Sequence, residues 1–417
     1  MLFRRDNAGQ EASSPSELDG NGSVSWRVFD AEELRKAAIV DEIRALMARS
    51  GDRLLAHDPI WLTGALPDRP DRVGGLPVIY GLWRGGRLVG YAPFIQSIRT
   101  LRFAIGELTL YRYRVPSLIL THDITTAITS ETERVAQVRE LLSLLTHRVS
   151  PAKALSFEGL PIDSVVHQEV VRLQGGGSWI SVGGVQTREH HFANLPSSFD
   201  QYERQLGSRS RRSLRYSKRK LLGHLDGALL VRRYTDRQEI PEFIAVAQAI
   251  SRKTYQWKLL KLGLRNTDAL TARLNLAVDH GWMRSYILYC REKPVAFMLG
   301  YLYRGIYYYI DVGYDPVWSK WSVGSILQVE VIRDLLSGEN SPTILDFSVG
   351  FAKHKARFAN LLREETNLFL LQASLCNHLI VSIYYISIGL DKGFSAIANA
   401  LGVKPQLKKW LRRIASG

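Results

Sequence analysis

Residues 343–358 read TILDFSVGFAKHKARF. The short apolar run at the start is typical of a buried strand, and it ends in Asp346. Gly350 follows in an expected loop, and Lys355 and Arg357 open the next segment. An acid at the end of a strand, then a flexible backbone and then cations, suits an anionic ligand held at a strand–loop junction. We therefore expect a ligand site at this junction.

A second signal lies just upstream, where a tyrosine-rich strand meets a helix. Ser322 is a suitable N-cap, and Gly324 and Ser325 fall in the first turn, so ligand atoms could approach the backbone closely. Free amide groups and the helix dipole at this point can hold a phosphate or diphosphate, and Lys320 adds positive charge. The alternative is an ordinary capped helix. In either case the expected buried side consists of Val323, Ile326, Leu327, Val331 and Leu335.

Composition bounds the class of protein. The chain has 417 residues, which is enough for two or three domains, and 46% of them are hydrophobic, which excludes general disorder. The net charge of +15 favours anionic partners: nucleotides, coenzyme A, RNA, acidic glycans or a membrane surface. Cys290 and Cys376 lack CxxC spacing, so we expect neither a disulfide framework nor a metal site, in keeping with a cytoplasmic location.

Hydrophobic periodicity predicts alternating helices and strands in both halves of the chain. Residues 1–25 are polar and are expected to form a disordered leader. In the first half we expect helices over 30–48 and 131–147, and strands over 78–83, 88–95, 101–110, 117–120 and 154–158. In the second half we expect helices over 197–225, 239–256, 268–280 and 322–337, and strands over 228–234, 284–290, 295–303, 305–313 and 343–347.

Two segments, 79–90 and 286–297, share an order of strand, tight turn led by an arginine, and strand. Their offset is a constant 207 residues. We interpret them as two copies of one mixed α/β domain joined near residue 195; chance resemblance of two hairpins is the alternative. The expected domains are 26–195 and 196–375, followed by an amphipathic helical tail over 376–417.

The segment from Arg204 to Lys220 carries eight cations and no acid, and Leu214, Leu221, Leu222 and Leu225 form a stripe at helical spacing. It predicts an amphipathic helix with one strongly cationic side, on which Arg211 and Arg215 lie. This side either guides an anion, such as a CoA phosphate, a sugar nucleotide or RNA, or is a solvated basic face. Only Tyr216 could stack on bases, so nucleic acid is the weaker option.

The C-terminal region contains the longest apolar run, Leu379 to Leu390, which is too short to span a bilayer. We expect a buried helix there, with a membrane-surface role as the alternative. The basic end, from Lys408 to Arg413, predicts an amphipathic helix that packs on the domain or touches anionic lipid.

Two further motifs, a histidine pair and a run of three glycines, do not predict a metal site or a dinucleotide site. His190 and His191 lack the convergent groups that zinc needs, and we expect no metal. The glycines at 175–177 lack dinucleotide-binding spacing and are expected to form a loop.

The strand, the loop at Ser319–Gly324 and the following helix resemble the acyl-CoA-binding core of the GNAT acetyltransferase superfamily. In that superfamily the loop usually reads Arg/Gln-x-x-Gly-x-Gly/Ala, and its amides bind the diphosphate of coenzyme A. Here the matching positions are Ser319, Ser322 and Gly324, with Lys320 adjacent to the first.

Four features in order along the chain resemble the subfamily associated with CelD-type polysaccharide biosynthesis proteins, related to FemAB-like transferases. They are Trp61 after His57-Asp58-Pro59, the Gly86–Pro93 return strand, the Arg211–Arg215 run, and Asp346 followed by Gly350 and Lys355. This resemblance implies two tandem GNAT-like domains, with the ligand site chiefly in the second.

The resemblance further implies acyl transfer from acetyl-CoA or another acyl-CoA to an amine or hydroxyl, with a sugar of an exopolysaccharide or envelope precursor as the expected acceptor. Asp346 or Asp311 would take the acceptor's proton, with Asp346 preferred, and Tyr314 would protonate the thiolate. Lys320, Ser322, Gly324 and Ser325 would hold the diphosphate. Lys355, Arg211, Arg215 and Gly350 would serve the acceptor or the nucleotide tail; an ion pair between Asp346 and Lys355 is the alternative.

Two further functions remain open at this point. A FemAB-like transferase would use aminoacyl-tRNA, which the basic helix allows. A non-catalytic scaffold in a polysaccharide assembly would keep the fold and lose cofactor binding.

Overall fold

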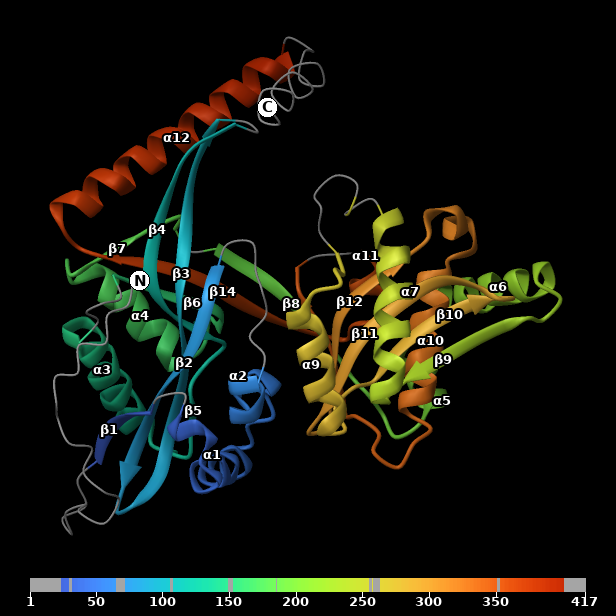
Figure 1. Ribbon diagram of the computed structural model, residues 1–417, viewed down its shortest axis with the longest axis horizontal. Helices are drawn as coiled ribbons and strands as arrows, with labels where there is room; N and C mark the ends of the chain where they lie inside the picture. The colour runs from blue at the N-terminus through green and yellow to red at the C-terminus, as the bar shows by residue number, and fades with distance from the viewer. Residues whose placement is uncertain are drawn as a thin grey trace. The chain divides into compact units, whose positions relative to one another are not determined.

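A computed structural model shows that the chain forms two compact units (Figure 1). The structure describes residues 24–29, 32–64, 72–105, 108–148, 153–184, 186–254, 257, 263–350 and 353–400. Unit 1 comprises residues 1–50, 68–187 and 366–417, and unit 2 comprises residues 51–67 and 188–365. The two units are therefore not continuous in sequence, unlike the predicted domains 26–195 and 196–375. Residues 51–67 belong to unit 2, and residues 366–375 belong to unit 1.

Unit 1 is a mostly antiparallel sheet with the strand order β1-β2-β3-β4-β6-β14, in which β4 and β6 are parallel. Helices α3 and α4 cover one face of this sheet, and their leucines and valines form a core with Phe94, Leu120 and Phe157. The strands are β1 (Val24–Phe29), β2 (Arg72–Arg84), β3 (Arg87–Ile105), β4 (Leu108–Thr121), β5 (Thr125–Thr126), β6 (Ala154–Pro161) and β7 (Trp179–Ser181). The helices are α1 (Ala37–Ser50), α3 (Glu131–Arg148), α4 (Val165–Gly175) and α12 (Leu375–Ala400).

Unit 2 has the strand order β8-β13-β12-β11-β10-β9, in which β12 and β13 run parallel. Helices α6 and α10 contribute to the core on one face of the sheet, and α7 and α9 to the core on the other. The strands are β8 (Gln186–Asn194), β9 (Leu229–Tyr234), β10 (Ser285–Cys290), β11 (Lys293–Tyr303), β12 (Ile306–Tyr314), β13 (Ile344–Val349) and β14 (Leu361–Gln372), whose last residues belong to unit 1. The helices are α2 (Pro59–Gly64), α5 (Phe199–Gln205), α6 (Ser208–His224), α7 (Ile240–Lys253), α9 (Asp268–Asp279), α10 (Val323–Leu335) and α11 (Lys353–Phe358).

Both hairpins of the proposed repeat are present. Strands β2 and β3 pair up to Arg84 and Arg87, and the turn between them uses Gly85 and Gly86 at positive φ (54° and 74°). Strands β10 and β11 pair in the same antiparallel way, and there Arg291 takes the positive φ of 57°. The expected buried side of α10 is also confirmed, since Val323, Ile326, Leu327, Val331 and Leu335 are at most 4% exposed.

Three predicted elements differ from the observed ones. The basic run is two helices, because α5 ends at Gln205, and Leu206 and Gly207 separate it from α6. The strands expected over 88–95, 101–110 and 117–120 form one long β3–β4 hairpin. The run Leu379 to Leu390 is helical as expected, but it is not buried throughout, because one side of α12 is exposed.

Some predictions fall wholly or largely outside the described residues. These are the leader over 1–25, of which only the last two residues are described, and the basic end from Lys408 to Arg413. Conversely, no strand was predicted at β1, β5, β7, β8 or β14, and no helix at α2, α4 or α11.

Candidate active site

The parallel pairing of β12 and β13 is short. It joins Ile306 to Ile344, Tyr307 to Leu345 and Tyr308 to Asp346. Strand β12 then continues to Tyr314 and β13 to Val349, and no further pair between the two strands occurs among the described residues. Asp346 therefore lies where the two parallel strands part.

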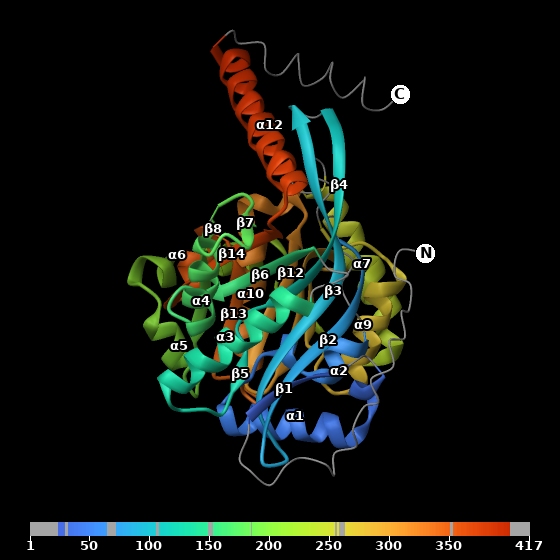
Figure 2. The same ribbon diagram turned by 90° about the vertical axis from the view of Figure 1, so that its left-hand side faces the viewer.

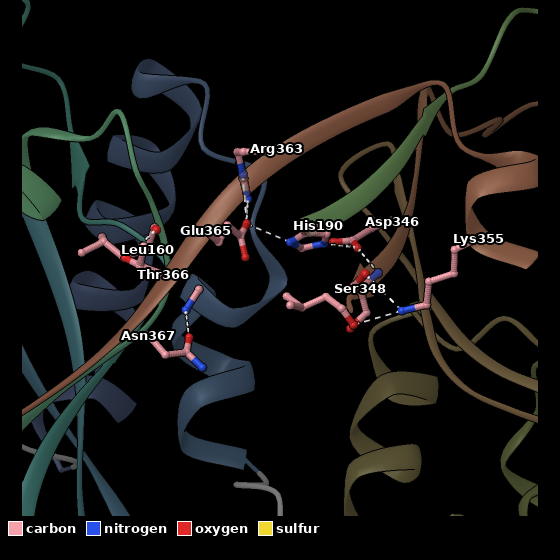
Figure 3. Close-up of polar contacts among 11 residues, drawn as sticks. Leu160, His190, Asp346, Ser348, Lys355, Arg363, Glu365, Thr366 and Asn367 are labelled. Carbon is pink, nitrogen blue, oxygen red and sulfur yellow. Dashed lines mark hydrogen bonds and ion pairs between the residues drawn. The ribbon is translucent and has the colours of Figure 1, made fainter. Parts of the chain in front are cut away.

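A chain of charged side chains crosses the sheet at this point (Figure 3). Nε2 of His190 on β8 lies 2.6 Å from Oδ1 of Asp346, and its Nδ1 lies 2.8 Å from Oε1 of Glu365 on β14. Arg363 donates from Nε to the same glutamate oxygen over 2.9 Å. The side chains of His190 and Glu365 are 3% and 1% exposed, so the imidazole is held between two carboxylates away from water.

The surroundings of His190 favour its charged form. Burial alone would lower its pKa, but hydrogen bonds to Asp346 and Glu365 and their negative charges outweigh burial and raise the pKa above the usual 6.5. A protonated imidazole donates from both nitrogens, which matches one carboxylate on each side.

Asp346 keeps one oxygen available. Its Oδ1 accepts from His190 and from the backbone N–H of Ser348 over 2.6 Å, whereas no partner for Oδ2 is found in the described part of the chain. The side chain retains 11% exposure. A carboxylate fixed by one oxygen and open at the other can accept a proton from a bound acceptor.

Residues after Asp346 form a tight turn, as the predicted loop required. Ser348 and Gly350 both have positive φ, 64° and 102°, and the N–H of Gly350 donates to Glu189 O over 2.9 Å. Nζ of Lys355 donates to the carbonyl oxygens of Ser348 and Val349, at 3.2 and 3.0 Å. Burial lowers the pKa of Lys355, while the charge of Asp346 opposes this shift.

The contacts of Lys355 bear on the alternative of an Asp346–Lys355 ion pair. Asp346 is paired with His190, and no direct ion pair to Lys355 occurs among the described side chains. The structure therefore brings Asp346, Gly350 and Lys355 together, as predicted, but through the turn backbone.

Asp311 and Tyr314 lie further along β12. Burial raises the pKa of Asp311 to about 6, and its side chain is half-buried. A register shift between Leu299 and Gly300 of β11 leaves Ile310 without a partner residue there, and Ile310 is 46% exposed. In the described contacts neither Asp311 nor Tyr314 touches Asp346.

The start of α10 differs from the expected cap. Ser322 precedes the helix in a left-handed conformation (φ 56°, ψ 36°), and its side chain makes no capping hydrogen bond. The prediction of a Ser322 side-chain cap was therefore wrong, because this backbone geometry turns the residue away from the first amides. Within the described residues the N–H groups of Val323, Gly324 and Ser325 have no acceptor, and the first turn contains no acid.

Aromatic rings surround this helix start. The position of a Cβ on Gly324 would lie 3.4 Å from the ring of Tyr314. Lys220 of α6 and Lys320 both lie over the ring of Trp321, at 5.4 and 5.2 Å from its centroid. The predicted Lys320, Ser322, Gly324 and Ser325 thus lie together with one end of the basic helix.

The cations of α6 are partly compensated. Arg215 forms a bidentate pair with Glu203 of α5, at 3.0 and 2.5 Å, and Lys218 pairs with Glu330 of α10 at 2.7 Å. Acids on the neighbouring helices α5 and α10 therefore compensate part of the positive charge of a segment that contains no acid of its own. Arg211 contacts the carbonyl oxygen of Arg204 at 3.4 Å.

Sequence reasoning missed His190, Glu365 and Arg363 as functional residues. Strands β8 and β14 are rich in polar residues, so their periodicity gave no strand signal. One signal was present: Glu365 lies just before the apolar run Leu368–Leu371. An acid that begins a buried run requires a partner.

The raised pKa of His190 predicts a pH-dependent stability. The folded state binds this proton more tightly than the unfolded state, so the contribution is fully present below about pH 6.5 and is lost as pH rises through the higher folded-state pKa. We expect the unfolding midpoint to fall as the pH rises from about 6.5 into the alkaline range, and this fall to be smaller in His190→Gln, which does not titrate. Thermal unfolding across this range tests the prediction; identical profiles for the two proteins would contradict it.

Residues 208–356 match the family described as Acetyltransferase (GNAT) domain. The chain is similar to the crystal structure of FemX, with a TM-score of 0.52 and 10% identity over 77% of this chain and 96% of that chain. It is less similar to a tandem GNAT protein from the clavulanic acid biosynthesis pathway (TM-score 0.46, 11% identity, 84% and 99% covered). A further structure is the C-terminal domain of a putative lysylphosphatidylglycerol synthetase from Agrobacterium fabrum (TM-score 0.44, 11% identity, 83% and 95% covered). No curated protein matches the sequence.

The family match bears on the class of protein. It covers residues 208–356, most of unit 2, including Asp346 and the start of α10, and supports an acyltransferase. At 10% identity the likeness to FemX shows the fold alone. The predicted mixed α/β fold with a helical C-terminal region is confirmed.

Proposed function

We propose that unit 2 transfers an acyl group from acetyl-CoA or another acyl-CoA to an amine or hydroxyl, on a sugar of an exopolysaccharide or envelope precursor. The observation that carries this proposal is Asp346, fixed through Oδ1 and open at Oδ2 where β12 and β13 part, inside the GNAT match. The CelD-type subfamily is proposed from the sequence features given above.

Asp346 is the proposed general base. The acceptor's nucleophilic atom attacks the thioester carbonyl, Asp346 Oδ2 takes its proton, and the C–S bond breaks to release CoA as thiolate, which then gains a proton. His190 and Glu365 act as positioning residues, because their hydrogen bonds fix the carboxylate's orientation. Tyr314, 42% exposed, is the proposed donor to the thiolate.

Asp311 is the second candidate for the base. Its pKa of about 6 suits proton transfer near neutral pH. Its hydrogen bond is with the backbone of Val312, and among the described side chains it has no histidine partner like that of Asp346. We propose the backbone N–H of Ile310, which has no partner residue at the register shift, as the donor to the developing oxyanion.

The start of α10 fits the diphosphate of coenzyme A. The helix presents three amide groups without acceptors in the described part of the chain, its first turn carries no acid, and Lys320 and Lys220 lie beside it. When bound, acyl-CoA would supply the activated thioester. Lys320, Ser322, Gly324 and Ser325 would hold its diphosphate, and Lys355, Gly350, Arg211 and Arg215 would serve the acceptor or the nucleotide tail.

Thermal shift with acetyl-CoA and longer acyl-CoAs tests the donor. At about 100 times the dissociation constant, the ligand should stabilise the protein by about 2.7 kcal/mol. Pantetheine, which lacks the diphosphate, should give a much smaller shift at the same concentration. The variant Gly324→Asp should abolish the shift with acetyl-CoA, since it places a negative charge where the diphosphate would bind. Equal shifts with pantetheine and CoA would contradict the role of α10.

The cationic face of α6 favours a second candidate, transfer from aminoacyl-tRNA. Arg209, Arg212 and Arg219 are exposed, and no ion pair involves them among the described side chains. Binding of tRNA that weakens with salt, together with no thermal shift from any acyl-CoA, would favour this function. The absence of both responses would favour the non-catalytic scaffold.

A further inference from the structure

Helix α12 of unit 1 has an exposed side without charge. From Leu375 to Leu390 the chain contains no lysine, arginine, aspartate or glutamate. Large apolar side chains nevertheless face solvent along this stretch. We call them the α12 stripe: Leu375 (92% exposed), Leu379 (63%), Ile383 (47%), Ile386 (61%) and Leu390 (56%).

The opposite side of α12 is already occupied. Val381 and Tyr384 pack in a core with Phe103 of the β3–β4 hairpin, and Tyr113 Oη donates to Asn377 Oδ1 over 3.4 Å. In both views the helix extends alongside this hairpin (Figures 1 and 2). The stripe is therefore not the side that holds α12 on unit 1. A solvent-facing helix side with several large apolar residues marks an interaction surface.

We propose that the α12 stripe docks on the surface of an anionic lipid bilayer, an inference that goes beyond the proposed acyl transfer. A membrane-surface helix inserts apolar side chains below the headgroups and gains from nearby cations when the lipid is anionic. The chain supplies both signals. Directly after α12, residues 401–417 carry five cations and no acid: Lys404, Lys408, Lys409, Arg412 and Arg413.

Charge also argues against the other occupants of the stripe. A second copy of the chain carries the same net charge of +15, so charge repulsion would oppose self-association. An anionic bilayer is attracted by the same charges. No described helix is long and apolar enough to cross a membrane.

Vesicle co-sedimentation of the full chain tests the proposal. With vesicles of phosphatidylcholine containing about 30% phosphatidylglycerol, most of the protein should pellet at low salt, and with phosphatidylcholine alone little should pellet. The variant Leu379→Gln/Ile383→Gln/Ile386→Gln should lower the partition coefficient at least about tenfold. All three side chains are exposed, so the fold should persist, as circular dichroism and the midpoint of thermal unfolding would show.

Two matched controls separate the contributions. Leu230→Gln/Val317→Gln changes apolar side chains that are 58% and 79% exposed in unit 2 and should bind vesicles like the parent protein. Lys408→Gln/Lys409→Gln should weaken binding more than Arg87→Gln/Arg252→Gln, which removes the same charge elsewhere.

Several results would overturn the proposal. Unchanged vesicle binding by the stripe variant would show that charge alone binds lipid. No binding to anionic vesicles, with a dimer in sedimentation velocity that the stripe variant dissociates, would assign the stripe to self-association. No binding in either assay would leave the stripe without a role at membranes. Vesicle binding and sedimentation do not depend on acyl transfer, so these results can refute the membrane proposal whether or not the proposed function is correct.

Discussion

Replacing Asp346 by asparagine should lower the rate of acyl transfer by about 10²- to 10⁴-fold. The amide has nearly the same shape and can still accept through its oxygen from the backbone N–H of Ser348, so the turn should persist. It cannot accept a proton from the acceptor. Release of free CoA thiol from acetyl-CoA, measured with a panel of amino sugars and sugar nucleotides, gives the rate.

The control for this prediction is Asp311→Asn, which neutralises the other candidate base. We expect it to change the rate less than Asp346→Asn, and we expect both variants to keep the thermal shift with acetyl-CoA. If Asp311→Asn caused the larger loss, the base would be Asp311 and Asp346 would have a structural role. His190→Gln should lower kcat more than it raises KM and shift the pH profile, which a residue needed only for folding would not do.

Replacing Glu365 by glutamine should destabilise unit 2 by about 3 kcal/mol. The glutamate side chain is 1% exposed and accepts from both His190 and Arg363, so its neutralisation leaves a buried imidazolium with one counter-charge fewer. Breaking a buried ion pair usually lowers the free energy of unfolding by about 3–5 kcal/mol. We expect a loss at the lower end of this range, because His190 can lose its proton when Glu365 is neutralised. The loss should therefore be larger at pH 6 than at about pH 8.

Urea unfolding followed by tryptophan fluorescence measures this effect. Glu364→Gln is the matched control: it removes the same charge from the adjacent residue of β14, which is exposed because neighbouring strand residues point to opposite faces. We expect its unfolding midpoint to stay close to that of the parent protein. Equal losses in the two variants would indicate a general effect of charge and would refute the buried network as the cause.

The fold was predictable where the sequence pattern was local. The two hairpins follow from apolar strands around glycine or arginine turns, and α10 follows from apolar residues at helical spacing. The polar strands β8 and β14 were not predicted, because their polar side chains contact residues that are distant in sequence and show no local pattern. His190 lies 156 residues from Asp346 and 175 from Glu365.

The candidate site likewise contains residues that were predictable from the sequence and residues that were not. Asp346, Gly350 and Lys355 were predicted together because they lie within one short stretch, and the structure joins them through one turn. The neighbours of Asp346 across the sheet were not predictable, because register between strands is a tertiary property.

The sequence by itself determined the alternation of helices and strands, the acid at the end of β13, the helix start after β12 and the basic helix, because each depends on residues a few positions apart. Only the tertiary structure decided that the acid binds a buried histidine, that acids of α5 and α10 pair with cations of α6, and that one side of α12 stays exposed. These outcomes depend on which distant segments come into contact, and a pattern of neighbouring residues does not contain that information.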